Sequence, residues 1–160
     1  MSIHCQFAKF FANSTWIVPC ETLLAFQTID NIIKPISDQT VWIIDGYKDG
    51  YIFGTSYTTI DGNPTAKTQL IGSITPLGEV LLSFISDHTI TSGQGKFLFL
   101  DGQWQFVMQT NSLNSFIGGV LGITHWSYMR KVAPCDPLYQ KLPGVNISVP
   151  QFIELFKSQS

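Results

Sequence analysis

The sequence is poor in charged residues and nearly devoid of arginine. Only 12% of its 160 residues are charged, about half of the roughly 25% typical of soluble proteins. Arg130 is the one arginine, and the lysines form no cluster. Recognition of a nucleic-acid backbone needs several clustered cations. The sequence therefore excludes nucleic acid as an expected partner.

Long apolar runs and a regular cysteine pattern are also lacking. Runs such as VWII and FLFL are far shorter than the roughly 20 residues that span a bilayer, which predicts no transmembrane segment. A lysine interrupts the apolar stretch near the N-terminus, which is atypical of a signal peptide, so we expect a cytoplasmic rather than a secreted protein. Cys5, Cys20 and Cys135 show no C-x-x-C spacing, which disfavours a disulfide framework or a zinc site. A single disulfide between the N-terminal and C-terminal segments stays open, should the compartment be oxidising.

Hydrophobic residues are abundant, at 44% of the chain. A chain of this length is expected to form one domain, residues 1–160, with a substantial core. Few charges mean that uncharged polar side chains cover the surface, as in a β-protein or a protein that hides part of its surface against a partner. We divide the domain into an N-terminal segment with a helix (1–38), a β-barrel core (40–131) and a C-terminal loop with a short helix (132–160).

Short apolar runs separated by glycine-containing turns fill the middle of the chain. Asp-Gly pairs at 49–50, 61–62 and 101–102 predict two-residue hairpin turns, because type I′ turns require positive φ at both positions. Gly54 and Gly72 interrupt strands, which is typical of the bulges or bends that let a sheet close. Seven strands are predicted, at 40–46, 51–60, 65–75, 79–86, 96–100, 103–110 and 119–131.

The unbroken series of hairpins predicts a mainly β fold, an antiparallel meander that closes into a small β-barrel. A two-sheet sandwich is the alternative, but a Greek-key sandwich needs some long crossings. Residues 20–34 have apolar side chains at helical spacing, which predicts the short N-terminal helix there, ending before Pro35. A second short helix is expected after Ser148. Residues 111–122 are expected to form a lid over one barrel mouth or an Ω-loop.

Two side chains of the predicted barrel stand in a familiar order, with Trp42 on the first core strand and Arg130 on the last. In this respect residues 40–131 resemble the calycin barrels, which include the lipocalins, the fatty-acid-binding proteins and the avidins. In those families a basic side chain from the final strand covers a tryptophan of the first strand, so the resemblance implies a cation over the indole face. The chain departs from the lipocalin pattern at Thr40, where that pattern has glycine, and no avidin-like set of biotin contacts matches.

The stretch GVLGITHWSYMRK, residues 119–131, concentrates the side chains with the most varied chemistry. On a strand they divide into two faces, with His125, Ser127 and Met129 on one and Trp126, Tyr128 and Arg130 on the other. Alternation alone leaves open which face is internal. The stretch is then either a terminal strand with a packed histidine and an aromatic pair, or a polar cluster that contacts a ligand in an apolar cavity.

Signatures of catalysis, metal binding and cofactor binding are missing. No G-x-S-x-G elbow, P-loop or dinucleotide fingerprint occurs, and His4, His88 and His125 have no metal-ligand spacing. Asp45, Asp49, Asp61 and Asp101 occupy predicted turn positions, where their side chains are expected to cap backbone N–H groups. We therefore expect no metal, no cofactor and, on balance, no enzymatic activity.

These observations predict that the barrel binds a small apolar or amphipathic molecule in its interior without covalent chemistry. The expected ligand-binding residues are the apolar lining and three polar anchors: Phe97, Phe99, Trp104, Phe106 and Met108, with Tyr57, His125 and Tyr128. A barrel filled by its own side chains would instead be a protein–protein interaction module with a homo-oligomeric or other protein partner. A third hypothesis is a barrel isomerase or cyclase that uses His125 or Tyr128 as acid or base.

Overall fold

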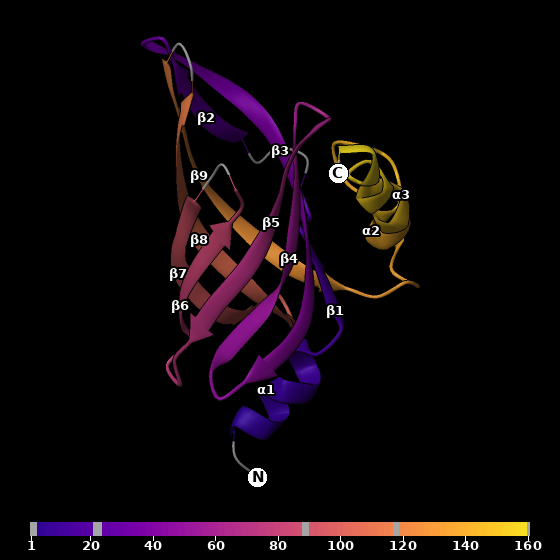
Figure 1. Cartoon of the computed structure of the whole chain (residues 1–160). Coiled ribbons are helices and arrows are strands. Elements are labelled where there is room, and N and C mark those ends of the chain that lie inside the picture. Colours follow the sequence, from indigo (N-terminus) through magenta and orange to yellow (C-terminus); the bar gives the residue numbers. More distant parts are fainter. Residues whose placement is uncertain (1–2, 21–23, 88–89, 117–118, 160) are drawn as a thin grey trace.

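The computed structural model of the chain describes residues 3–20, 24–87, 90–116 and 119–159, and its described part is built mainly from antiparallel strands (Figure 1). The strands are β1 (Ser14–Ile17), β2 (Leu24–Ile29), β3 (Ile32–Lys48), β4 (Tyr51–Ile60), β5 (Asn63–Ile74), β6 (Glu79–Ile85), β7 (Ile90–Leu100), β8 (Gln103–Phe116) and β9 (Gly119–Val132). The helices are α1 (Ile3–Phe11), α2 (Pro137–Gln140), α3 (Val149–Glu154) and the 3-10 helix η1 (Lys157–Gln159).

The sheet closes into a barrel. Strands β3 to β9 are neighbours in chain order, and the position between β9 and β3 is shared by β1 and β2, which lie end to end. Ile17 of β1 is opposite both Val41 of β3 and Arg130 of β9. Phe26 of β2 is likewise opposite residues of both strands. The predicted mainly β fold and barrel closure are thus confirmed.

The predicted hairpin turns are also confirmed. Both residues of each Asp-Gly pair have positive φ, with values of 49° and 95° at 49–50, 50° and 78° at 61–62, and 50° and 76° at 101–102. Gly54 lies beside a bulge, because the pairing of β3 with β4 shifts register between Ile44 and Gly46. Gly72 differs, since its ladder is regular and its missing side chain makes room for Leu82.

The helix predicted at residues 20–34 is wrong, because the described part of this segment forms β2 and the start of β3. Asp30 and Asn31 have φ of 49° and 62° and connect the two strands as a two-residue turn. Aspartate and asparagine tolerate the left-handed conformation, so they form here the kind of turn that Asp-Gly pairs form in the other hairpins. The N-terminal helix of the fold is α1, which lies earlier in the chain.

The lid or Ω-loop predicted at residues 111–122 is also wrong. Strand β8 continues to Phe116 and β9 begins at Gly119, and the two are paired from Gln105 opposite Arg130 to Phe116 opposite Gly119. Ser112 is paired on one side with Thr91 and on the other with Ile123, so the ladders of two neighbours hold this segment as strand. Gly118 and His88 lie outside the described residues, as does the side chain of His4.

Helix α1 closes one end of the barrel, below the strands in Figure 1, and packs on an aromatic core. Phe97 and Trp16 each lie 4.8 Å from Phe106, measured between ring centroids. Lys131 fastens the helix to β9, because its Nζ donates to Phe10 O over 2.6 Å and lies 4.3 Å from the centre of the Phe10 ring. The barrel's own side chains therefore fill this half of its interior.

The C-terminal segment covers the outer side of β3 and β4 (Figure 1). Ser148 and Gln151 form a capping box at the start of α3, which confirms the helix expected after Ser148. Phe152 and Val149 of α3 pack with outward side chains of the barrel. No helix among the described residues is both long enough and apolar enough to cross a bilayer.

The contact implied between Trp42 and Arg130 is not formed. Trp42 packs in the barrel interior, whereas Arg130 Nη2 binds Asp136 Oδ2 over 2.9 Å. Alternation along β9 explains the difference, since Met129 occupies the interior and its neighbour Arg130 therefore faces outward. The cation that does lie over an aromatic ring at this seam is that of Lys131.

Candidate functional site

The barrel interior away from α1 is lined by hydroxyl groups. Alternating positions of β3, β4, β5, β7, β8 and β9 place them on the inner face, and the ladders pair Thr40 with Thr58, Ser56 with Thr68 and Thr91 with Ser112. We call this region the hydroxyl half, and it comprises Thr40, Ser56, Thr58, Thr68, Thr91, Thr110, Ser112 and Ser127. Two direct hydrogen bonds join its members, from Thr91 Oγ1 to Ser112 Oγ over 2.9 Å and between Thr40 Oγ1 and Thr58 Oγ1 over 3.0 Å.

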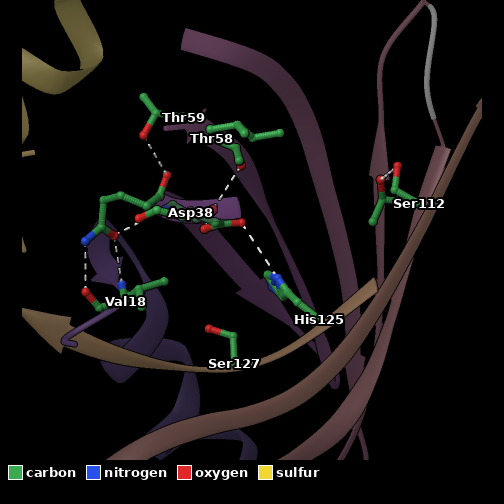
Figure 2. A network of polar contacts seen from close by, with 12 residues as sticks. Val18, Asp38, Thr58, Thr59, Ser112, His125 and Ser127 are labelled. Carbon is green, nitrogen blue, oxygen red and sulfur yellow. Dashed lines mark hydrogen bonds and ion pairs between the residues drawn. The ribbon is translucent and has the colours of Figure 1, made fainter. Parts of the chain in front are cut away.

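A carboxylate and an imidazole meet within this region. Asp38 Oδ2 of β3 lies 3.7 Å from His125 Nδ1 of β9, and both side chains are almost buried (Figure 2). Thr40 Oγ1 donates to Asp38 Oδ1 over 3.1 Å. Burial raises the pKa of Asp38, while the charge of His125 and the hydrogen bond from Thr40 act in the opposite direction. The carboxyl group thus sits where water solvates it poorly.

The pair lies on the inner side of a break in the barrel wall. Strand β1 ends at Ile17, opposite Val41, and β2 begins at Leu24, opposite Ser37. No described β1 or β2 residue is paired with Asp38 on β3 or with His125 on β9. The Asp38 and His125 side chains therefore connect β3 to β9 where the intervening strand is interrupted.

Gln39 bridges the same break on the outer side, because it follows Asp38 on the strand. Its Nε2 donates to Val18 O over 3.0 Å and to Pro143 O over 2.9 Å. Its Oε1 accepts from Val18 N over 3.2 Å and from Thr40 N over 2.9 Å. Sequence reasoning missed both Asp38 and Gln39, although the polar run SDQT between Ile36 and the apolar VWII is a signal that marks them.

Trp42 lies where the aromatic core meets the hydroxyl half. Its side chain is 1% exposed, packs against Phe84 and Phe106, and stands opposite Ser56 in the ladder. Among the described residues its Nε1 finds no hydrogen-bond partner, whereas Trp16 Nε1 donates to Ser14 Oγ over 2.8 Å. A buried N–H without an acceptor costs about 1–3 kcal/mol. Such a group marks a place for an acceptor from water or from a bound molecule.

The residues predicted to bind a ligand are distributed over three places. Phe97, Phe106 and Met108 are buried in the interior, and His125 faces it from β9. Trp104 and Phe99 lie at the rim beside α1, where Trp104 stacks on Phe97 at 4.8 Å between ring centroids.

The other two predicted anchors, Tyr57 and Tyr128, lie on the outer side of the barrel. Tyr57 packs against Phe156 of the C-terminal segment. Tyr128 alternates with the buried Ser127 and Met129, and it hydrogen-bonds Cys20. Burial raises the pKa of Tyr128, and the nearby Cys20 thiol raises it further. Of the three predicted polar anchors, His125 alone is internal, because alternation by itself did not say which face points inward.

In the part of the chain that the structure describes, no group of three or more histidine, cysteine, aspartate or glutamate side chains is arranged to hold a metal ion. Cys135 is exposed and forms no disulfide. The side chain of Cys5 lies outside the described residues.

Comparison with known proteins gives no relative: no family model, no curated protein and no solved structure matches this chain. Its function therefore has to be argued from the chemistry of the barrel itself.

Proposed function

We propose that the barrel binds a small amphipathic molecule in its hydroxyl half, without covalent chemistry. The observation that carries this proposal is the indole N–H of Trp42, which is buried without an acceptor between aromatic and hydroxyl-bearing side chains. A ligand with an apolar body and a hydrogen-bonding head group suits this boundary, since each part meets surface of its own kind. Phe106, Met108 and His125 from the expected set would line the site together with Trp42.

The head group of this ligand is expected to carry no net charge. Asp38 and His125, the two ionisable side chains that we place in this region, already face each other. An unpaired charge buried there would lack a partner, at a high desolvation cost. Hydroxyl groups both donate and accept, so a carbonyl or hydroxyl group of the ligand would be satisfied by them and by the Trp42 N–H.

Mass spectrometry of the gently purified protein, native and then denatured, tests the proposal. We expect a small mass that is present in the native spectrum and lost on denaturation. The variant Trp42→Phe removes the N–H from the interior and should retain less of that mass. Tyr57→Phe removes one hydroxyl group from the outer side and serves as the matched control. A bare wild-type protein would contradict the proposal, as would equal retention by the Trp42→Phe variant.

Acid–base catalysis by His125 is the second candidate function, and the position of Asp38 favours it. A carboxylate beside Nδ1 orients an imidazole and leaves Nε2 to exchange protons with a bound molecule. If this holds, the bound molecule should change its isomeric composition during incubation with the wild-type protein. The His125→Ala variant should bind the molecule and leave its composition unchanged. Identical composition with both proteins would restrict the function to binding.

A further inference from the structure

A second site lies outside the barrel. A shallow, open groove of about 620 Å³ runs over the outer side of β6, β7, β8 and β9, and its size falls within the roughly 300–1,000 Å³ of small-molecule sites. It is lined by Glu79, Val80, Gln94, Gly95, Lys96, Val107, Met108, Gln109 and Trp126. Every residue of this groove belongs to the described part of the chain.

The groove forms where two strands approach unusually closely. A Cβ atom at Gly95 would lie 2.0 Å from Val107 O and 2.8 Å from Met108 Cα. Only glycine fits at that distance, so the backbones of β7 and β8 can approach this closely beneath the groove.

The floor of the groove presents an ordered row of side chains. Gln94 of β7 is directly opposite Gln109 of β8, which in turn is opposite Trp126 of β9. Trp126 is 57% exposed, so its indole is available at one end of the row. Glu79 and Lys96 are opposite each other on β6 and β7 and bring one charge of each sign.

We propose that this groove binds a saccharide, with one sugar ring stacked on Trp126 and its hydroxyl groups bonded to Gln94 and Gln109. A pyranose ring combines an apolar face of C–H groups with a rim of hydroxyl groups, and a flat indole beside side-chain amides matches both. Each amide offers two donor hydrogens and an acceptor oxygen, which suits neighbouring hydroxyl groups.

The charges of the lining support the same ligand class. Glu79 and Lys96 give the groove no net charge, so neither an anion nor a cation is favoured over an uncharged molecule. A wholly apolar ligand would leave the amides of Gln94 and Gln109 without partners. Because the groove is open, it covers one side of the ligand, and we expect a dissociation constant on the order of a millimolar.

Titration of ¹⁵N-labelled protein with cellobiose, maltose and N,N′-diacetylchitobiose tests this site. At least one of these sugars should give saturable shifts at the Trp126 indole and the side-chain amides of Gln94 and Gln109. Trp126→Ala and Gln109→Leu should each weaken binding by about tenfold or more. Both side chains face outward, so these substitutions should leave the fold intact. Tyr51→Ala is the matched control, because Tyr51 is also 57% exposed on a strand but lies outside the groove.

Several outcomes would overturn the proposal. They are the absence of shifts with all three sugars, shifts that persist unchanged in the Trp126→Ala variant, and equal shifts with phenol, which would indicate general affinity for flat rings. The groove is separate from the hydroxyl half, so failure here would leave the proposal for the interior untouched.

Discussion

Gln39 and Val18 exchange two hydrogen bonds, as two residues on neighbouring strands do, but one partner is a side chain. Gln39 Nε2 donates to Val18 O and Gln39 Oε1 accepts from Val18 N. The amide thus continues the ladder past the end of β1, on the side of β3 where no described residue of β1 or β2 pairs with Gln39. Its further bond to Pro143 O ties the C-terminal segment to the same point.

Truncation of Gln39 should therefore destabilise the whole barrel. Gln39→Ala leaves the buried backbone groups of Val18 and Pro143 without partners, and we expect a loss of about 3 kcal/mol in the free energy of unfolding. Gln39→Glu should lower the free energy of unfolding by at least as much, because a carboxylate cannot donate to the carbonyl oxygens of Val18 and Pro143. Urea denaturation measures both values. Gln69→Ala, on an exposed position of β5, should change the value by less than about 0.5 kcal/mol.

Asp38 should make stability depend on pH. Its pKa is raised by burial from the ordinary value of 3.8. The folded protein then holds a proton that the unfolded chain releases, so the free energy of unfolding falls as pH rises from 3.8 through the raised pKa. Asp38→Asn keeps an acceptor for Thr40 and should remove this part of the pH dependence.

Urea denaturation of both proteins at a series of pH values measures the effect. The variant should be at least as stable as the wild type at neutral pH, and its advantage should shrink toward pH 3.8. A variant that is less stable at neutral pH would show instead that attraction between the ionised carboxylate and His125 outweighs the cost of burial.

Lys131 should hold α1 on the end of the barrel. Lys131→Met preserves the apolar stem but removes the hydrogen bond to Phe10 O and the cation over its ring, and we expect a loss of about 1–2 kcal/mol. Hydrogen exchange of the α1 amides should speed up more than exchange in β5. The control is Lys9→Met, on an exposed position of α1. Equal exchange rates in the wild type and the Lys131→Met variant would show that aromatic packing alone holds the helix.

Trp42→Phe should affect the loaded and the empty protein differently. Its N–H has no acceptor among the described residues, so protein stripped by unfolding and refolding should lose only the packing of the larger ring, and its melting temperature should fall only slightly. Protein carrying its co-purified molecule should lose more stability on substitution, since the stabilisation by a ligand grows with the logarithm of its affinity. Thermal unfolding of both forms makes the comparison. A large loss in the stripped form would indicate that the indole acts through packing.

Local rules were enough to predict the hairpins from the sequence, because Asp-Gly turns need nothing beyond their own two residues. The Asp30-Asn31 turn was missed, since its flanking apolar residues also fit helical spacing. The inward face of β9 depends on Met129 and Ser127 being buried by other strands, which alternation does not reveal. Asp38 and Gln39 could not be assigned for a similar reason: their partners, His125, Val18 and Pro143, come from distant segments.

The shared position of β1 and β2 also determines when the molecule can fold. These strands precede β3, yet their second neighbour is β9. Ile17 therefore cannot pair with Arg130, nor Thr28 with Gly122, until β9 has been synthesised. Contacts so distant in sequence slow folding, because the closing loop must be ordered first. On the ribosome, the edges of β1, β2 and β8 stay unpaired until β9 emerges. We expect barrel closure to follow synthesis of β9, and chains that stall before it to be the ones that aggregate.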